Sequence, residues 1–141
     1  TPKPSSAASD VYKRQYLDHT IASWTKSHAL APFSSEALAE YRRSFARGEY
    51  IHAACEDYRA GATEDRRLDE EDLASGRRIA APTLALWGSH GIAASVGDVL
   101  AVWRGWCENV EGEAVDCGHF VVEEAPEPVT RALVGFFSQR G

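Results

Sequence analysis

Residues 79–141 alternate between short apolar runs and helical patterns, and this order restricts the fold more than any other feature of the chain. The segment 82–88 reads Pro-Thr-Leu-Ala-Leu-Trp-Gly, which is typical of a buried parallel strand because its apolar run is continuous and bounded by proline and glycine. A second strand is predicted over 112–116. With helices after each run, the order predicts parallel pairing through right-handed crossovers.

Both helices in this region have an apolar stripe. Asp98 can cap the first helix, and Pro126 and Pro128 fit the first turn of the second, where proline is tolerated. The stripe of the first helix comprises Val99, Val102, Trp103 and Trp106, and that of the second comprises Val129, Ala132, Leu133, Phe136 and Phe137. We expect the second helix to cover the sheet, and we place Trp103 and Trp106, with Trp87, in the core.

Residues 1–15 are rich in Pro, Ser and Ala and have no apolar period, so we predict a disordered, non-native tail. The spacing of Leu38, Tyr41 and Phe45 predicts a helix over 34–48, capped by Ser34 or Ser35 and ended by Gly48.

A second helix is predicted over 51–62, and residues 63–78 form a charged run that we interpret as a solvated helical face. In and just after this charged run, the sequence predicts burial of Leu68, Leu73 and Ile79 only.

Composition excludes several classes of function. The net charge of −6 comes from interspersed acidic and basic residues, which argues against nucleic acid as a partner. The longest uncharged stretch, 79–97, is interrupted by proline and glycine, so no membrane span is expected. Cys55, Cys107 and Cys117 lack close pairing, and the five histidines lack metal-ligand spacing. We therefore expect reduced thiols, a cytoplasmic location and no metal.

His119 is the strongest candidate for chemistry. It follows the predicted strand 112–116, and catalysts in parallel sheets gather beyond the carboxyl ends of strands. Gly118 allows a sharp turn before it, and an imidazole can transfer a proton near neutral pH. A histidine in an acidic domain is more commonly a surface or structural residue, so position rather than identity supports the assignment. The chain contains no Gly-x-Ser-x-Gly, nor an equivalent with Asp or Cys at its centre.

From Tyr16 onward the sequence resembles the C-terminal half of bacterial haloacetate dehalogenases, including fluoroacetate dehalogenases, which have the α/β-hydrolase fold. Gly-His-Phe is shared by many hydrolases, whereas the combination with Cys-Glu-Asp-Tyr-Arg-Ala-Gly-Ala is more specific. The segments that carry the resemblance are Ala22-Ser-Trp-Thr25, Ala39-Glu-Tyr-Arg42, Cys55-Glu-Asp-Tyr-Arg-Ala-Gly-Ala62, Leu84-Ala-Leu-Trp-Gly88, Val102-Trp-Arg104, Cys117-Gly-His-Phe120 and Glu123-Glu-Ala-Pro126.

The resemblance implies an α/β fold and three segments of the chain. Residues 1–15 are the tail, 16–78 are a helical lid portion that returns to the core, and 79–141 are the last two parallel strands and flanking helices of the hydrolase core. It also implies hydrolytic removal of halide from a small 2-haloacid. An Asp nucleophile displaces the halide, and water then cleaves the ester, so no cofactor is expected. The resemblance is also compatible with a homodimer of the full-length protein.

Site residues are implied by the same resemblance. His119 matches the base that activates water, Tyr58 matches a lid tyrosine that helps to hold the leaving halide, and Trp24 matches a lid tryptophan that lines the pocket. From pattern alone, Tyr58 and Trp24 would be ordinary packing residues. Arg59 is interpreted as a local salt-bridge partner. Asp116 is interpreted as a strand-end residue rather than the acid that pairs with the base.

The nucleophile and acid of the family would lie before Tyr16, so the chain alone is expected to be inactive. An epoxide hydrolase, which shares the Asp nucleophile, is the main alternative, and a Ser esterase is another. A non-catalytic reading also stays open, either as a truncated product or as a small interaction module that exposes a sheet edge.

Overall fold

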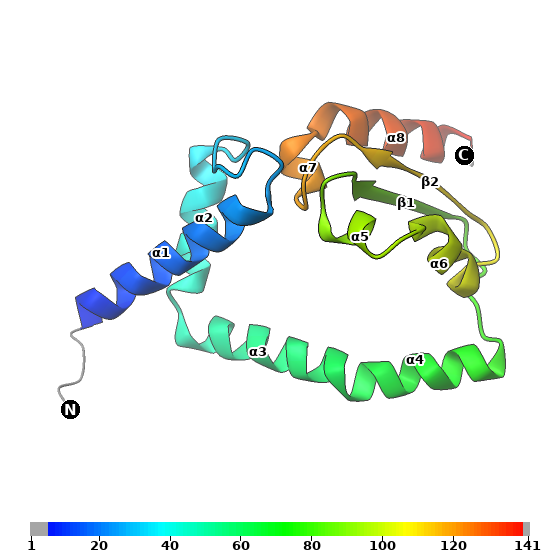
Figure 1. Ribbon diagram of the computed structural model, residues 1–141, viewed down its shortest axis with the longest axis horizontal. Coiled ribbons are helices and arrows are strands. Elements are labelled where there is room, and N and C mark those ends of the chain that lie inside the picture. Colours follow the sequence, from blue (N-terminus) through cyan, green and yellow to red (C-terminus); the bar gives the residue numbers. More distant parts are fainter. Residues whose placement is uncertain (1–5, 140–141) are drawn as a thin grey trace.

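The computed structural model describes residues 6–139 and shows helices arranged around a small parallel sheet (Figure 1). In chain order the elements are α1 (Ser6–Trp24), α2 (Ser35–Phe45), α3 (Gly48–Ala62), α4 (Glu64–Ser75), β1 (Thr83–Gly88), α5 (Ile92–Ser95), α6 (Val99–Trp106), β2 (Val110–Val115), α7 (Val121–Glu124) and α8 (Pro126–Ser138). No helix within the described range is long and apolar enough to cross a membrane.

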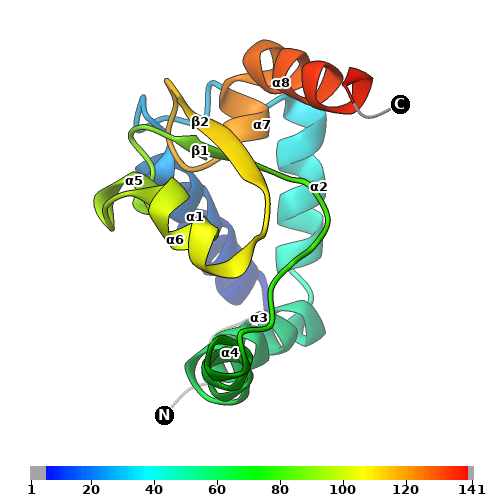
Figure 2. The ribbon, with the colours of Figure 1, turned by 90° about the vertical axis from the view of Figure 1, so that its right-hand side faces the viewer.

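The predicted strands pair in parallel, which confirms that part of the sequence analysis. The register runs from Thr83 opposite Val110 to Gly88 opposite Val115. Helix α8 lies on one face of the sheet, and α5 and α6 lie on the other (Figures 1 and 2). The predicted cap of α6 is also confirmed, because an Asp98 carboxylate oxygen accepts a hydrogen bond from the Ala101 N–H at 3.0 Å. Helix α8 begins at Pro126 as expected.

Burial around this sheet is shallower than predicted. Only Gly88 of β1 is fully buried, and the side chains of Trp87 and Trp106 are half-buried. Trp103 is 40% exposed, so its placement in the core is wrong. The two strands within residues 6–139 offer a narrow surface, which cannot cover the whole apolar stripe of α6.

The expected disordered tail differs from the structure over residues 6–15, which belong to helix α1. Residues 1–5 lie outside the described residues. The helix is held through its later turns, where Asp18 accepts two hydrogen bonds of 2.8 Å from the Arg42 guanidinium and Tyr16 stacks on Phe45. Because the first turns carry no apolar stripe, helical periodicity could not reveal them.

Helix α2 begins as predicted, since the Ser34 hydroxyl accepts a hydrogen bond from the Ala37 N–H at 3.1 Å. Its end was predicted wrongly. The helix ends at Phe45, and Gly48 instead begins α3. The core of this region is formed by Ile21, Phe33 and Leu38.

Helices α3 and α4 follow one another roughly in line, apart from the sheet (Figures 1 and 2). Neither contains a buried residue, which confirms the solvated interpretation of the charged run. Leu68, Leu73 and Ile79 were expected to be buried but are 46%, 49% and 46% exposed. Arg59 forms the expected local salt bridge, with Glu56.

Candidate active site

His119 lies on the turn between β2 and α7, beyond the carboxyl ends of both strands. The turns that follow the two strands are joined by backbone hydrogen bonds. The Ser89 N–H donates to the Val115 carbonyl at 2.8 Å, and the His90 N–H donates to the Cys117 carbonyl at 3.0 Å. The sheet therefore fixes where the His119 turn begins.

Trp24, at the end of α1, packs against His119. The His119 N–H donates a 2.9 Å hydrogen bond to the Trp24 carbonyl oxygen. Their rings meet edge to face, with centroids 5.0 Å apart. The structure thus brings together two of the three residues that the sequence singled out, from positions far apart in the chain.

A cleft of about 290 Å³ opens beside these two rings. Its lining includes Trp24, Lys26, His28, His90, Ile92 and His119. Because His119 is exposed, its imidazole can reach water or a small molecule in this cleft. The arrangement suits proton transfer to or from a ligand that lies there.

Tyr58 is not part of this arrangement. It lies on α3, its side chain is 74% exposed, and it does not line the cleft beside His119. Figure 1 shows α3 apart from the loops that carry His119 and Trp24. The structure therefore neither buries Tyr58 as a packing residue nor brings it to the candidate base.

Asp116 links two residues that line the cleft, Lys26 and His90. The Lys26 ammonium donates to its carboxylate at 2.6 Å, and His90 Nε2 lies 3.1 Å from the same oxygen. The hydrogen bond and charge of Lys26, followed by the hydrogen bond from His90, lower the pKa of the Asp116 carboxyl. Asp116 thus pairs with Lys26 and His90 rather than with His119. Sequence reasoning missed Lys26 and His90, because no motif connects them with Asp116.

The contacts of Asp116 predict a pH effect. A carboxyl whose pKa is lowered in the folded state stabilises that state above its ordinary pKa, and the contribution disappears as the pH falls through the lowered value. Lys26→Gln should therefore move the pKa of Asp116 up towards its ordinary value of 3.8. The measurement is an NMR titration of the Asp116 carboxyl carbon. His90→Asn should give a smaller upward shift, and an unchanged titration in Lys26→Gln would contradict the assignment.

Cys117 stands two residues before His119 but is a poor nucleophile in this position. Its side chain is buried, and burial, then the nearby carboxylates of Glu124 and Asp116, raise the pKa of the thiol. A protonated thiol attacks slowly, because the thiolate is the reactive form. His119 therefore has no Cys partner at this turn.

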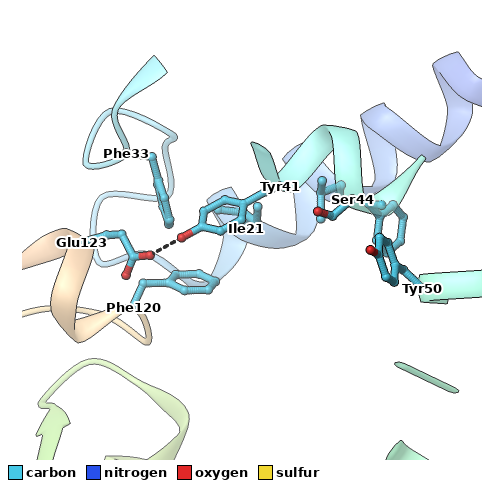
Figure 3. A pocket seen from close by; sticks show the side chains of 9 residues that line it. Ile21, Phe33, Tyr41, Ser44, Tyr50, Phe120 and Glu123 are labelled. Atoms are coloured by element: carbon cyan, nitrogen blue, oxygen red, sulfur yellow. Dashed lines mark hydrogen bonds between the residues drawn. The ribbon is translucent and has the colours of Figure 1, made fainter. Parts of the chain in front are cut away.

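A separate apolar pocket of about 420 Å³ lies beside Phe120, between α1, α2 and α7 (Figure 3). Phe33 and Phe120 meet edge to face there, with ring centroids 5.2 Å apart. Across its mouth the Tyr41 hydroxyl donates a 2.6 Å hydrogen bond to Glu123, which raises the pKa of the tyrosine. This contact ties α2 to α7 next to His119.

The comparisons with known proteins agree with this geometry. Over 106 residues the chain is 38% identical to fluoroacetate dehalogenase from Burkholderia sp., covering 75% of this chain and 34% of that protein. Over 125 residues it is 35% identical to soluble epoxide hydrolase from Corynebacterium sp. strain C12, covering 87% of this chain and 41% of that protein. No model of a protein family matches the chain.

A solved structure gives the decisive likeness. ALR0039 from Nostoc sp. PCC 7120, named as an α/β hydrolase, superposes with a TM-score of 0.83 at 40% identity, covering 97% of this chain and 46% of that one. The chain has the fold of the C-terminal part of an α/β hydrolase. It spans less than half the length of these hydrolases. The predicted fold class is thereby confirmed.

Proposed function

We propose that the chain is the C-terminal part of a hydrolase that removes halide from 2-haloacetates, with His119 as general base. The observation that carries this proposal is the position of His119, which lies past the ends of two parallel strands and faces a cleft beside Trp24. The 38% identity with a fluoroacetate dehalogenase supports the substrate class.

The reaction has two steps. A carboxylate of an Asp outside this chain attacks the carbon that bears the halogen, so that a C–O bond forms and halide leaves with the C–X electron pair. His119 then takes a proton from water, and the resulting hydroxide attacks the ester carbonyl. The bond between the carbonyl carbon and the substrate oxygen then breaks, and that oxygen takes the remaining proton of the water. The Asp carboxylate and a 2-hydroxyacid result, and His119 returns its proton to solvent. Because water and a carboxylate suffice, the chemistry requires no cofactor.

Two aromatic residues have proposed roles beside the base. Trp24 supplies an apolar wall to the cleft and holds the His119 backbone through its carbonyl oxygen. The halide-binding role proposed for Tyr58 rests on the sequence resemblance alone, because its ring lies outside this cleft. The physical reason for the role is that a phenol donor can stabilise developing halide charge in a pocket that excludes water.

An epoxide hydrolase is the second candidate, and a specific observation favours it. The epoxide hydrolase from Corynebacterium matches a larger share of this chain than the dehalogenase does, 87% against 75%. The same Asp and His pair would open an epoxide and then hydrolyse the ester. The two activities therefore differ in the leaving group, a halide or an alkoxide that remains attached to the substrate.

The test is an assay of the full-length protein with fluoroacetate, chloroacetate and a terminal epoxide, measuring free halide and diol. We expect halide release from the haloacetates. Diol formation without halide release would overturn the proposal in favour of the epoxide hydrolase. Residues 1–141 alone should show negligible turnover, because His119 then has no ester to hydrolyse. Halide release by residues 1–141 that His119→Ala abolishes would contradict this placement of the nucleophile.

A further inference from the structure

We propose that Glu124 is a positioning residue for His119, whose turn it fastens to the end of α1. The inference rests on the proposed function, because it gives Glu124 a part in placing the base. Glu124 ends the short helix α7 and is half-buried, and its carboxylate folds back towards the turn that precedes the helix. Nothing in the sequence pattern distinguishes it from the neighbouring Glu123.

The Glu124 carboxylate accepts hydrogen bonds from three backbone N–H groups. One oxygen accepts from Lys26 at 2.8 Å and from Gly118 at 3.0 Å, and the other accepts from Phe120 at 3.1 Å. Two of these donors flank His119, and the third lies two residues after Trp24. Hydrogen bonds to a charged acceptor are stronger than neutral ones. One side chain thus joins two segments that are more than ninety positions apart.

The N–H groups around His119 are all committed to this junction. Those of Gly118 and Phe120 donate to Glu124, while that of His119 donates to the Trp24 carbonyl. The backbone directions on both sides of His119 are therefore set, and they direct its ring towards Trp24. The turn at Gly118 lies close against the end of α1, because a Cβ on Gly118 would lie 2.4 Å from the Lys26 nitrogen and 2.6 Å from the Trp24 carbonyl oxygen.

A role limited to capping α7 would have different consequences. The bond from Phe120, the N-cap residue of α7, resembles the reach of a capping-box glutamate to the N-cap N–H. That bond would stabilise α7, but it would not join the turn to α1. The bond from Lys26 has no function in a cap, and it ties Glu124 to the segment that follows Trp24.

Glu123 offers a matched control. It is an adjacent glutamate on the same short helix, but its carboxylate accepts from the Tyr41 hydroxyl instead of from the turn. Removing it deletes one contact between α7 and α2, and it leaves the three backbone bonds of Glu124 in place. Glu123→Ala therefore changes charge and helix composition by the same amount as Glu124→Ala.

The experiment is NMR of the 141-residue chain, comparing Glu124→Ala, Glu124→Gln and Glu123→Ala with the unmodified protein. In Glu124→Ala we expect the amides of Lys26, Gly118 and Phe120 to exchange at least about tenfold faster, as loss of a charge-assisted hydrogen bond implies. The cross-peaks between the His119 ring and the Trp24 indole should weaken or vanish. Exchange of the β1 and β2 amides reports whether the sheet remains folded.

Glu124→Gln should give partial rescue. Its single carbonyl oxygen can still accept from Lys26 and Gly118, while its amide group faces the Phe120 N–H and repels it. If Glu124→Ala does not fold, Glu124→Gln tests the proposal. In that variant we expect faster exchange at the Phe120 amide and not at the amides of Lys26 and Gly118. Unchanged exchange and unchanged His119–Trp24 cross-peaks in Glu124→Gln and Glu124→Ala, or equal changes in Glu123→Ala, would overturn the proposal. These readouts require no turnover, so they are independent of whether the substrate proposal holds.

Discussion

His119→Asn in the full-length protein should release about one halide per active site in a burst and then turn over only slowly. In the proposed reaction the nucleophilic carboxylate displaces halide without help from the base, whereas the ester is cleaved only by water that His119 activates. The first step therefore survives the substitution and the second does not. General bases commonly contribute 10²–10⁴-fold, so steady-state halide release should fall by about that factor.

Two measurements check this result together. Rapid mixing with fluoroacetate or chloroacetate should show a burst of halide, and mass spectrometry should show a protein heavier by one carboxymethyl group. His52→Asn is the matched control, because His52 lies on α3 with a side chain that is 75% exposed, far from the cleft lining. It should retain full turnover.

The absence of a burst would change the interpretation of His119. In a Ser esterase the histidine activates the nucleophile itself, so its loss would remove both steps and leave no covalent product. An epoxide hydrolase would still accumulate an ester with an epoxide, but would release no halide from a haloacetate. The same variant thus separates the proposed reaction from each alternative.

The sequence predicts those parts of the fold that depend on local chemistry. The Ser34 and Asp98 side chains cap the helices that they were expected to cap, because a cap requires only neighbouring residues. The apolar run at 83–88 also forms the strand that its composition predicts. His119 could be found because Gly118 and the preceding strand place it at the edge of a parallel sheet.

Local sequence patterns could not predict contacts between residues that are far apart in the chain. Glu124 bonds to Lys26, which lies 98 positions earlier, and Asp116 contacts both Lys26 and His90, yet no local pattern connects these residues with one another. The prediction of burial was also wrong where it assumed that another element covers an apolar stripe. Trp103 lies on an apolar stripe, but the described residues leave it 40% exposed. An apolar period shows which side of a helix can be buried, but does not show what covers it.

Gly88→Ala should be among the most destabilising single substitutions in the chain. An added Cβ would lie 1.7 Å from the Gly118 carbonyl oxygen and 2.7 Å from that of Cys117, so the β1 end and the His119 turn would have to separate. Both obstacles are backbone atoms, which cannot rotate away as a side chain can. Overpacking of this kind costs typically 1–3 kcal/mol and sometimes more, and we expect about 3 kcal/mol from urea unfolding.

Gly135→Ala is the matched control, and it should act in the opposite direction. Gly135 lies inside α8, where an added Cβ would meet no atom within 4 Å, and alanine favours helix over glycine by about 0.5–1 kcal/mol. Opposite signs for the same chemical change would show that contact with the His119 turn, rather than glycine itself, decides the result. Equal stabilities for Gly88→Ala and the unmodified chain would mean that β1 and this turn do not meet as closely as the geometry requires. Gly118 lies in the turn that directs His119, so Gly88→Ala should also weaken the contact between the His119 and Trp24 rings. The stability of the sheet edge is therefore linked to the placement of the base.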